Sequence, residues 1–113
     1  MRLNLTEGET LSLFRERKGL TQKDFAKNYL KVSQSTLSLW ERDHVKLPVD
    51  HEAIPKITPT RGELCRVLRR RLRLTLRNVA SGIGVSHVTI VRMEREKLDP
   101  ARLWNYLKKV KKS

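Results

Sequence analysis

The sequence has 113 residues and carries 25 Lys and Arg against 12 Asp and Glu, which gives a formal net charge of +13. This length permits one ordinary domain or two very small ones, and it excludes a large enzyme with a deep cleft between domains. The apolar runs are too short for a membrane span or a signal peptide, so we expect a cytoplasmic protein whose partner is a polyanion.

The positive charge lies mainly in the second half of the chain. Residues 1–57 have a net charge of +2, whereas residues 58–113 have a net charge of +11. A strongly basic segment is typical of proteins that bind nucleic acid. We therefore expect the second half to supply most of the attraction to phosphate.

A capping box opens the first predicted helix of each half. Thr6 is followed three residues later by Glu9, and Thr60 stands in the same relation to Glu63. Apolar residues then recur at spacings of three and four, which is typical of an amphipathic helix. In the first half these residues are Leu11 and Phe14, and in the second they are Leu64, Val67 and Leu68.

Two shorter helices are predicted to follow in each half, with Thr21 and Ser33 as N-caps in the first half. Thr75 and Ser86 hold the same positions in the second half. The residues expected to face inward are Phe25, Ala26, Leu37 and Trp40, and then Val79, Ala80, Ile90 and Met93. The turn over residues 28–31 is one residue longer than its counterpart and lacks the glycines of residues 82–84, so it must be built differently.

Proline separates the two halves and opens a last helix. The prolines of residues 46–59 predict a linker that packs in part through Val45, Leu47, Val49, Ile54 and Ile57. Asp99 is the predicted N-cap of a fourth helix, with Pro100 in its first turn. Its inward residues are Leu103, Trp104, Leu107 and Val110, and Lys108–Lys112 is expected to close the chain as a flexible tail. We place the two units at residues 1–45 and 60–113.

The two halves align as copies of one unit. The identical pairs include Gly8 with Gly62, Leu20 with Leu74, Ala26 with Ala80, and Glu41 with Glu94. Residues 20–42 and 74–95 resemble the phage Cro/repressor family of helix-turn-helix proteins, above all in the run Val-Ser-x-x-Thr-Leu-Ser-x-Trp-Glu-Arg at residues 32–42. The resemblance implies an all-α fold of two tandem lambda-repressor-like helix-turn-helix units joined by a Pro-containing linker.

The resemblance also implies that the third helix of each unit enters the major groove of DNA. The residues that would face base edges are Gln34, Ser35, Ser38 and Leu39 in the first unit and His87, Val88, Val91 and Arg92 in the second. A Gln suits adenine, an Arg suits guanine, and an apolar side chain suits the thymine methyl. Because the two sets differ, we expect each unit to read a different half-site.

Other residues are expected to contact phosphate or to hold the unit together. The phosphate candidates are Gln22, Lys23, Ser33, Arg42, Arg77, Ser86, Thr89, Arg95 and Lys97. Leu76 replaces the Gln at the second unit's equivalent of Gln22, so Arg77 is expected to substitute for it. Two structural ion pairs are implied by the family pattern, Arg15 with Glu41 and Arg69 with Glu94.

Several of the remaining candidates have an ordinary structural explanation. Trp40 and Trp104 could stack on bases, but their inward spacing favours the core. Cys65 is expected to be a core residue rather than a reactive thiol. His87 is as consistent with a DNA contact as with a solvated side chain. The arginine run of residues 69–73 is as consistent with phosphate contact as with a solvated helix face.

Nothing in the sequence indicates an enzyme. His44 and His51 lack the spacing of metal ligands, a single Cys builds neither a disulfide framework nor a zinc site, and no nucleophile motif or Gly-rich phosphate loop is present. We therefore expect no catalysis, no cofactor, no metal and no small-molecule ligand.

The expected function is sequence-specific binding of a double-stranded DNA operator by a small transcriptional repressor. The resemblance suggests a phage or another mobile element as its source and the nucleoid as its place when bound. A homodimer of the whole chain is allowed. The alternative is an antitoxin or adaptor whose near-neutral first unit docks a protein partner while the other unit binds DNA. RNA binding is a third alternative, which a groove-reading helix disfavours.

Overall fold

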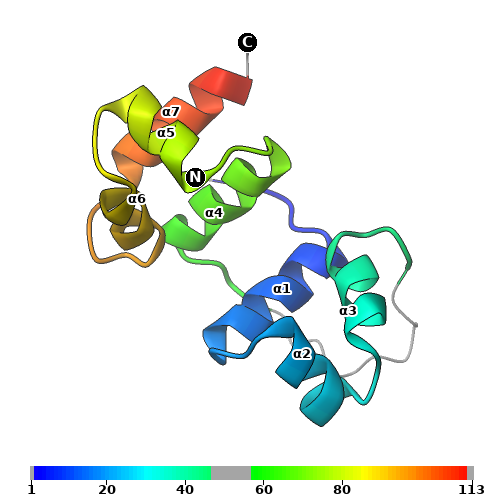
Figure 1. The fold of residues 1–113 in the computed structure, drawn as a ribbon. Helices are drawn as coiled ribbons and strands as arrows, with labels where there is room; N and C mark the ends of the chain where they lie inside the picture. Colours follow the sequence, from blue (N-terminus) through cyan, green and yellow to red (C-terminus); the bar gives the residue numbers. More distant parts are fainter. Residues whose placement is uncertain (1, 47–56, 112–113) are drawn as a thin grey trace. The chain divides into compact units, whose positions relative to one another are not determined.

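The computed structural model describes residues 2–46 and 57–111, and every regular element in these ranges is helical (Figure 1). The expected all-α fold is therefore confirmed. The chain forms two compact units. The first unit is Asn4–Thr58, and the second is Pro59–Ser113 together with Met1–Leu3. Of the helices in the described ranges, none has the length and apolar character needed to cross a bilayer.

The first unit contains α1 (Glu7–Arg17), α2 (Gln22–Asp24), the π-helical segment η1 (Phe25–Leu30) and α3 (Gln34–Glu41). Each predicted N-cap is confirmed. The Thr6 hydroxyl accepts from the Glu9 backbone N–H at 3.1 Å, and the Glu9 carboxylate accepts from the Thr6 N–H at 2.9 Å. Thr21 and Ser33 cap the following helices in the same manner. Each such cap is worth about 1 kcal/mol.

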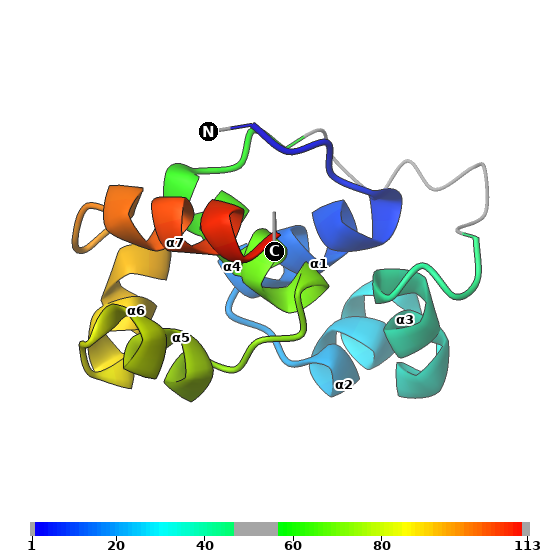
Figure 2. The ribbon, with the colours of Figure 1, turned by 90° about the horizontal axis from the view of Figure 1, so that it is seen from above.

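The second unit contains α4 (Arg61–Arg71), α5 (Leu76–Ile83), α6 (His87–Glu94) and α7 (Ala101–Lys111). Its caps repeat those of the first unit, including the box of Thr60 and Glu63 with distances of 3.1 and 2.9 Å. Thr75 and Ser86 cap α5 and α6. Figure 2 shows α7 lying with the other three helices of this unit.

The extra residue of the first unit is absorbed by the π-helix η1. In the second unit, the Ala80 carbonyl accepts from Gly84, four residues on. In the first unit, the equivalent Ala26 carbonyl accepts from Lys31, five residues on. The wider turn keeps the same carbonyl as the terminal acceptor, so the longer segment ends where its counterpart does. This is how the first unit builds its turn without glycine.

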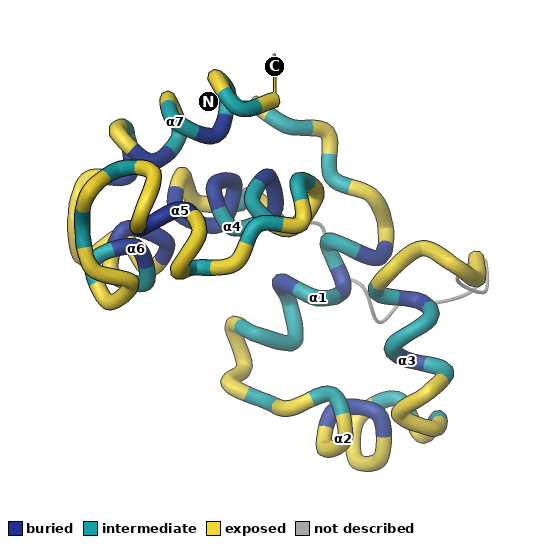
Figure 3. Tube along the Cα trace, turned by 45° about the horizontal axis from the view of Figure 1, so that its top comes forward, coloured by how far each residue is buried: buried dark blue, intermediate teal, exposed yellow. Residues whose placement is uncertain are grey.

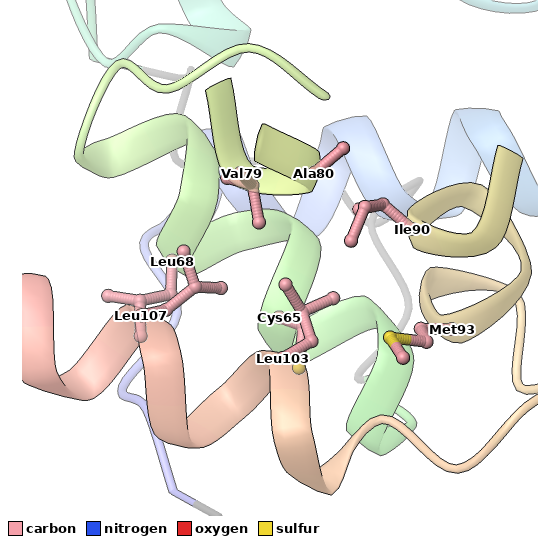
Figure 4. Packing of buried hydrophobic residues seen from close by; sticks show 8 residues of the cluster. All are labelled: Cys65, Leu68, Val79, Ala80, Ile90, Met93, Leu103 and Leu107. Carbon is pink, nitrogen blue, oxygen red and sulfur yellow. The ribbon is translucent and has the colours of Figure 1, made fainter. Parts of the chain in front are cut away.

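Each unit has its own apolar core, made of the residues predicted to face inward. In the first unit the core is Leu11, Phe25, Ala26, Leu37 and Trp40. In the second it is Cys65, Leu68, Val79, Ala80, Ile90, Met93, Leu103 and Leu107 (Figure 4). Trp104 packs against the second core, so neither tryptophan is placed as an open stacking platform. Along the helices of both units, buried residues alternate with exposed ones (Figure 3).

The predicted packing of the linker is wrong at Val45, whose side chain is 46% exposed because the chain turns out of α3 at Asp43. Ile57 is half-buried. Leu47, Val49 and Ile54 lie outside the described residues.

The last helix differs from its prediction at both ends. It begins one residue later than expected, because the Pro100 carbonyl accepts the first helical bond, from Trp104 at 2.9 Å. Pro100 thus takes the N-cap position, and the Asp99 carboxylate accepts from the Ala101 N–H at 3.0 Å. The flexible tail expected from Lys108 onward is wrong as far as Lys111, since α7 continues to that residue.

Among the residues that the structure describes, three positions in each unit adopt the left-handed backbone conformation, and they coincide when the two units are aligned. Each follows the end of a helix, where such a residue closes the last turn. The pairs are Gly19 with Arg73, Lys31 with Gly84, and Asp43 with Glu96. A side chain in this conformation costs about 1 kcal/mol relative to glycine. Each unit has glycine at only one of the three positions, and that position differs between the units.

A glycine in the first turn of the first helix allows each unit to close. A Cβ added at Gly62 would overlap the carbonyl oxygen of Glu94 and would lie 2.7 Å from that of Met93. At Gly8, an added Cβ would overlap the Trp40 carbonyl oxygen and lie 2.7 Å from that of Glu41. The first helix thus rests directly on the backbone at the end of the third helix, and only glycine leaves room for that approach.

We expect Gly62→Ala to lower the free energy of unfolding by about 2 kcal/mol, because the new methyl group meets backbone atoms that cannot rotate away. Urea unfolding followed by circular dichroism measures this change. Ser81→Ala, at an exposed position of α5, is the control and should stay within about 0.5 kcal/mol of the parent chain. A Gly62→Ala protein as stable as this control would contradict the close approach.

Candidate nucleic-acid interface

The predicted reading residues of the first unit lie on an open surface of α3. Gln34 and Ser35 are exposed, and Ser38 and Leu39 are half-buried. A hollow in this surface is lined by the four reading residues and two of the predicted phosphate contacts, namely Gln22, Gln34, Ser35, Ser38, Leu39 and Arg42. The hollow offers amide and hydroxyl groups beside one apolar side chain. The polar groups can form hydrogen bonds with base edges in the major groove, and the apolar side chain can contact a thymine methyl.

The equivalent surface of α6 has a different chemistry. His87, Val88 and Arg92 are exposed, and Val91 is half-buried. Val88 is 45% exposed although it is a large apolar residue. An exposed valine near an arginine suits a thymine methyl and a guanine edge better than it suits water.

The caps of the two third helices leave backbone N–H groups for an anion. The Ser33 hydroxyl accepts from the Thr36 N–H at 3.1 Å, and the Ser86 hydroxyl accepts from the Thr89 N–H at 3.3 Å. In each cap the two hydroxyl groups also share a hydrogen bond. This bond uses the proton of one hydroxyl, so the other hydroxyl of each cap still has a proton to donate. Each helix start offers phosphate that hydroxyl, the N–H groups of its first two residues and the positive end of the helix dipole.

Five predicted phosphate contacts are exposed cations flanking these helices. They are Lys23, Arg42, Arg77, Arg95 and Lys97. Lys23 and Arg77 stand at equivalent positions at the start of α2 and α5, so each unit carries a cation there. Nε of Arg42 donates to the Ser38 carbonyl at 3.3 Å, which holds this side chain beside α3.

A buried ion pair joins the first and third helices of each unit. Arg15 donates to Glu41 from Nε at 2.8 Å and from Nη2 at 3.1 Å. Arg69 donates to Glu94 from the same two atoms at 2.6 and 3.2 Å. The third donor of each guanidinium, Nη1, binds the carbonyl of the residue before the second helix's N-cap, at Leu20 (2.8 Å) and Leu74 (3.1 Å). One arginine thus fixes three segments.

The glutamate of this pair has a second partner that differs between the units. In the first unit, the Gln22 amide donates to Glu41 at 3.1 Å. Leu76 cannot replace that donor in the second unit, where Nε of Arg66 lies 3.5 Å from Glu94 instead. Gln22, predicted as a phosphate contact, is therefore also part of the support beneath α3.

Sequence reasoning missed two carboxylates that cap the first helices. Asp43 accepts from the Gly8 N–H at 3.0 Å and from the Thr6 hydroxyl at 2.6 Å. Glu96 accepts from the Gly62 N–H at 2.8 Å. The signal was present as an acidic residue two positions after Glu41 and Glu94, together with the repeated glycine.

The comparison with known families agrees with this geometry. A family model described as helix-turn-helix matches residues 11–51. The chain has no significant match among curated proteins or among solved structures. The matched segment is therefore similar to helix-turn-helix modules, a class to which many DNA-binding transcription regulators belong.

We expect Arg69→Met to destabilise the second unit by about 3 kcal/mol, because it leaves the buried Glu94 carboxylate without its main partner. Chemical unfolding measures the loss. Arg77→Met removes an exposed arginine from the same unit and should change stability by less than about 0.5 kcal/mol. The double variant Arg69→Met/Glu94→Leu removes both charges and should recover part of the loss. Equal effects of the two single variants would contradict a supporting role for the ion pair.

Proposed function

We propose that this protein binds double-stranded DNA in a sequence-specific manner through two non-identical reading helices, α3 and α6. The observation that carries the proposal is the hollow over α3, in which four reading residues converge with Gln22 and Arg42. A helix-turn-helix match over the same residues supports it. Base contacts from the hollow would select the sequence, and the flanking cations would set the position on the backbone.

The second unit is proposed to be a second helix-turn-helix copy. Its support is the repetition of detailed features, including the capping boxes, the closing glycine, the buried ion pair and the left-handed positions. Because α3 offers amide and hydroxyl groups where α6 offers valine and arginine, the two would prefer different base pairs. One chain would then recognise an asymmetric site.

The regulatory mode that we propose is repression. Each of the two compact units carries one of the proposed reading helices, so both units would lie on DNA. The simplest action of such a protein is to cover an operator and exclude polymerase. A cytoplasmic protein of a phage or another mobile element fits this mode, and a homodimer with four reading helices is compatible with it.

Selection of bound sites from random duplex DNA tests the proposal directly. We expect a preferred sequence with two distinct parts, one for each reading helix. Competition with duplex RNA of equal length should not displace the selected DNA, since the RNA major groove is too narrow for a helix. Binding without any base preference would overturn the proposal.

We expect Arg92→Ala to relax base preference at one position of the selected site by about 1–3 kcal/mol, because a bidentate arginine–guanine contact is lost. Repeating the selection with the variant measures the change. Arg95→Ala, an exposed arginine just beyond the end of α6, is the control and should weaken all sequences alike. An unchanged preference in the Arg92 variant would remove this residue from the reading set.

The second candidate function is an adaptor or antitoxin whose first unit docks a protein. It is favoured by the near-neutral charge of the first half of the chain. The double variant Gln34→Ala/Ser35→Ala separates the two functions. Loss of preference in one part of the selected site supports a DNA-reading first unit, whereas unchanged DNA binding would favour the docking alternative.

A further inference from the structure

Two helices of the second unit, α4 and α7, run in the same direction and end at the same place. The Cys65 thiol, midway along α4, lies 3.8 Å from the carbonyl oxygen of Pro100, the residue before α7, to which it donates. Closer to the ends of both helices, Leu68 of α4 packs beside Leu107 of α7 in the core (Figure 4). The last turns of the two helices, which end at Arg71 and Lys111, therefore lie together.

Basic residues from two distant parts of the sequence gather at this shared end. We call them the basic end, and they are Arg70, Arg71, Arg73, Lys108, Lys109 and Lys111. All are exposed except Lys108, which is half-buried with its ammonium group 5.6 Å from the centre of the Trp104 ring. The sequence contains no acidic residue between Glu63 and Glu94, and none after Asp99. The basic end is therefore built without acidic residues in either contributing helix beyond the first turn of α4.

Helix dipoles account for only part of this charge. The C-terminal end of a helix carries roughly half a negative charge, so two helix ends together attract about one cation. Arg73, Lys108 and Lys111 alone exceed that requirement, and the mutual repulsion of the cations opposes folding. Arg73 also lies beyond the end of α4, in the left-handed conformation. An external polyanion is the partner that such a surplus fits.

The basic end is continuous with the phosphate contacts predicted at the start of α5. Arg73 lies two residues before the N-cap Thr75, and Arg77 lies two residues after it. A membrane surface is the poorer partner, because peripheral membrane binding needs exposed apolar side chains beside the cations. Among the described residues, the exposed large apolar side chains are Tyr29, Val45, Val88 and Leu98, and none belongs to α4 or α7.

We propose that the basic end binds the phosphate backbone of duplex DNA outside the base pairs that α6 reads. This inference rests on the proposed function, and it adds a second contact surface to the second unit. The surface follows the negative charge of the backbone and carries no sequence information. It would lengthen the protected DNA beyond the bases that the two reading helices specify.

The test uses the full chain and the double variant Arg73→Gln/Lys111→Gln, which removes one charge from each contributing segment. Binding to the selected duplex is measured over a range of salt concentrations. Each lost phosphate contact lowers the slope of log affinity against log salt by about 0.9, so we expect a decrease of about 2. Base preference should not change. On a duplex trimmed to the specified bases, the variant and the parent chain should bind alike.

The matched control is Arg61→Gln/Arg102→Gln, which removes two exposed arginines from the first turns of the same two helices. Its salt slope should match that of the parent chain, and thermal unfolding shows that both variants are folded. If the parent chain binds no duplex, the proposed function itself fails. If the parent binds and the basic-end variant keeps its slope, the basic end is not a DNA contact. Loss of binding to phosphatidylserine vesicles with unchanged DNA binding would assign it to a membrane instead.

Discussion

The buried arginine–glutamate pair is the interaction on which each unit depends. Its carboxylate comes from the end of the third helix, its guanidinium comes from the first, and the remaining guanidinium donor binds the carbonyl before the second helix. Three segments of each unit are therefore held by one planar group, and the glutamate is 26 or 25 residues away in sequence. A lysine has no such fork and could not make all three contacts. The orientation of the third helix relative to its neighbours follows from this geometry.

Around that pair, the two units use different residues to bind the glutamate and to end the second helix. Gln22 supports the glutamate in one unit, and Arg66 does so in the other. One unit closes its middle turn with a π-helix and Lys31, whereas the other uses an ordinary helix and Gly84. These differences do not change the backbone fold, because in each unit the same carboxylate or carbonyl group still has a hydrogen-bond or ion-pair partner. The outward residues of α3 and α6 differ more, since they are exposed or only half-buried.

Sequence patterns predicted the features that depend on residues close together in the chain. The N-caps of the first three helices of each unit and most of the inward residues follow from side-chain chemistry and helical spacing, and the structure places them as expected. The π-helix could not be predicted, because its identity depends on which carbonyl accepts the final bond. The carboxylates of Asp43 and Glu96 were missed because their partners are more than 30 residues away. The basic end required the relative direction of α4 and α7, which depends on tertiary packing alone.

The packing of Leu3 against the core of the second unit makes that unit discontinuous in sequence. The whole of the first unit, Asn4–Thr58, stands between Leu3 and the helices whose core it covers. Excision of the first unit together with the residues before it would therefore also remove part of the apolar packing of the second unit, although the two units have separate cores.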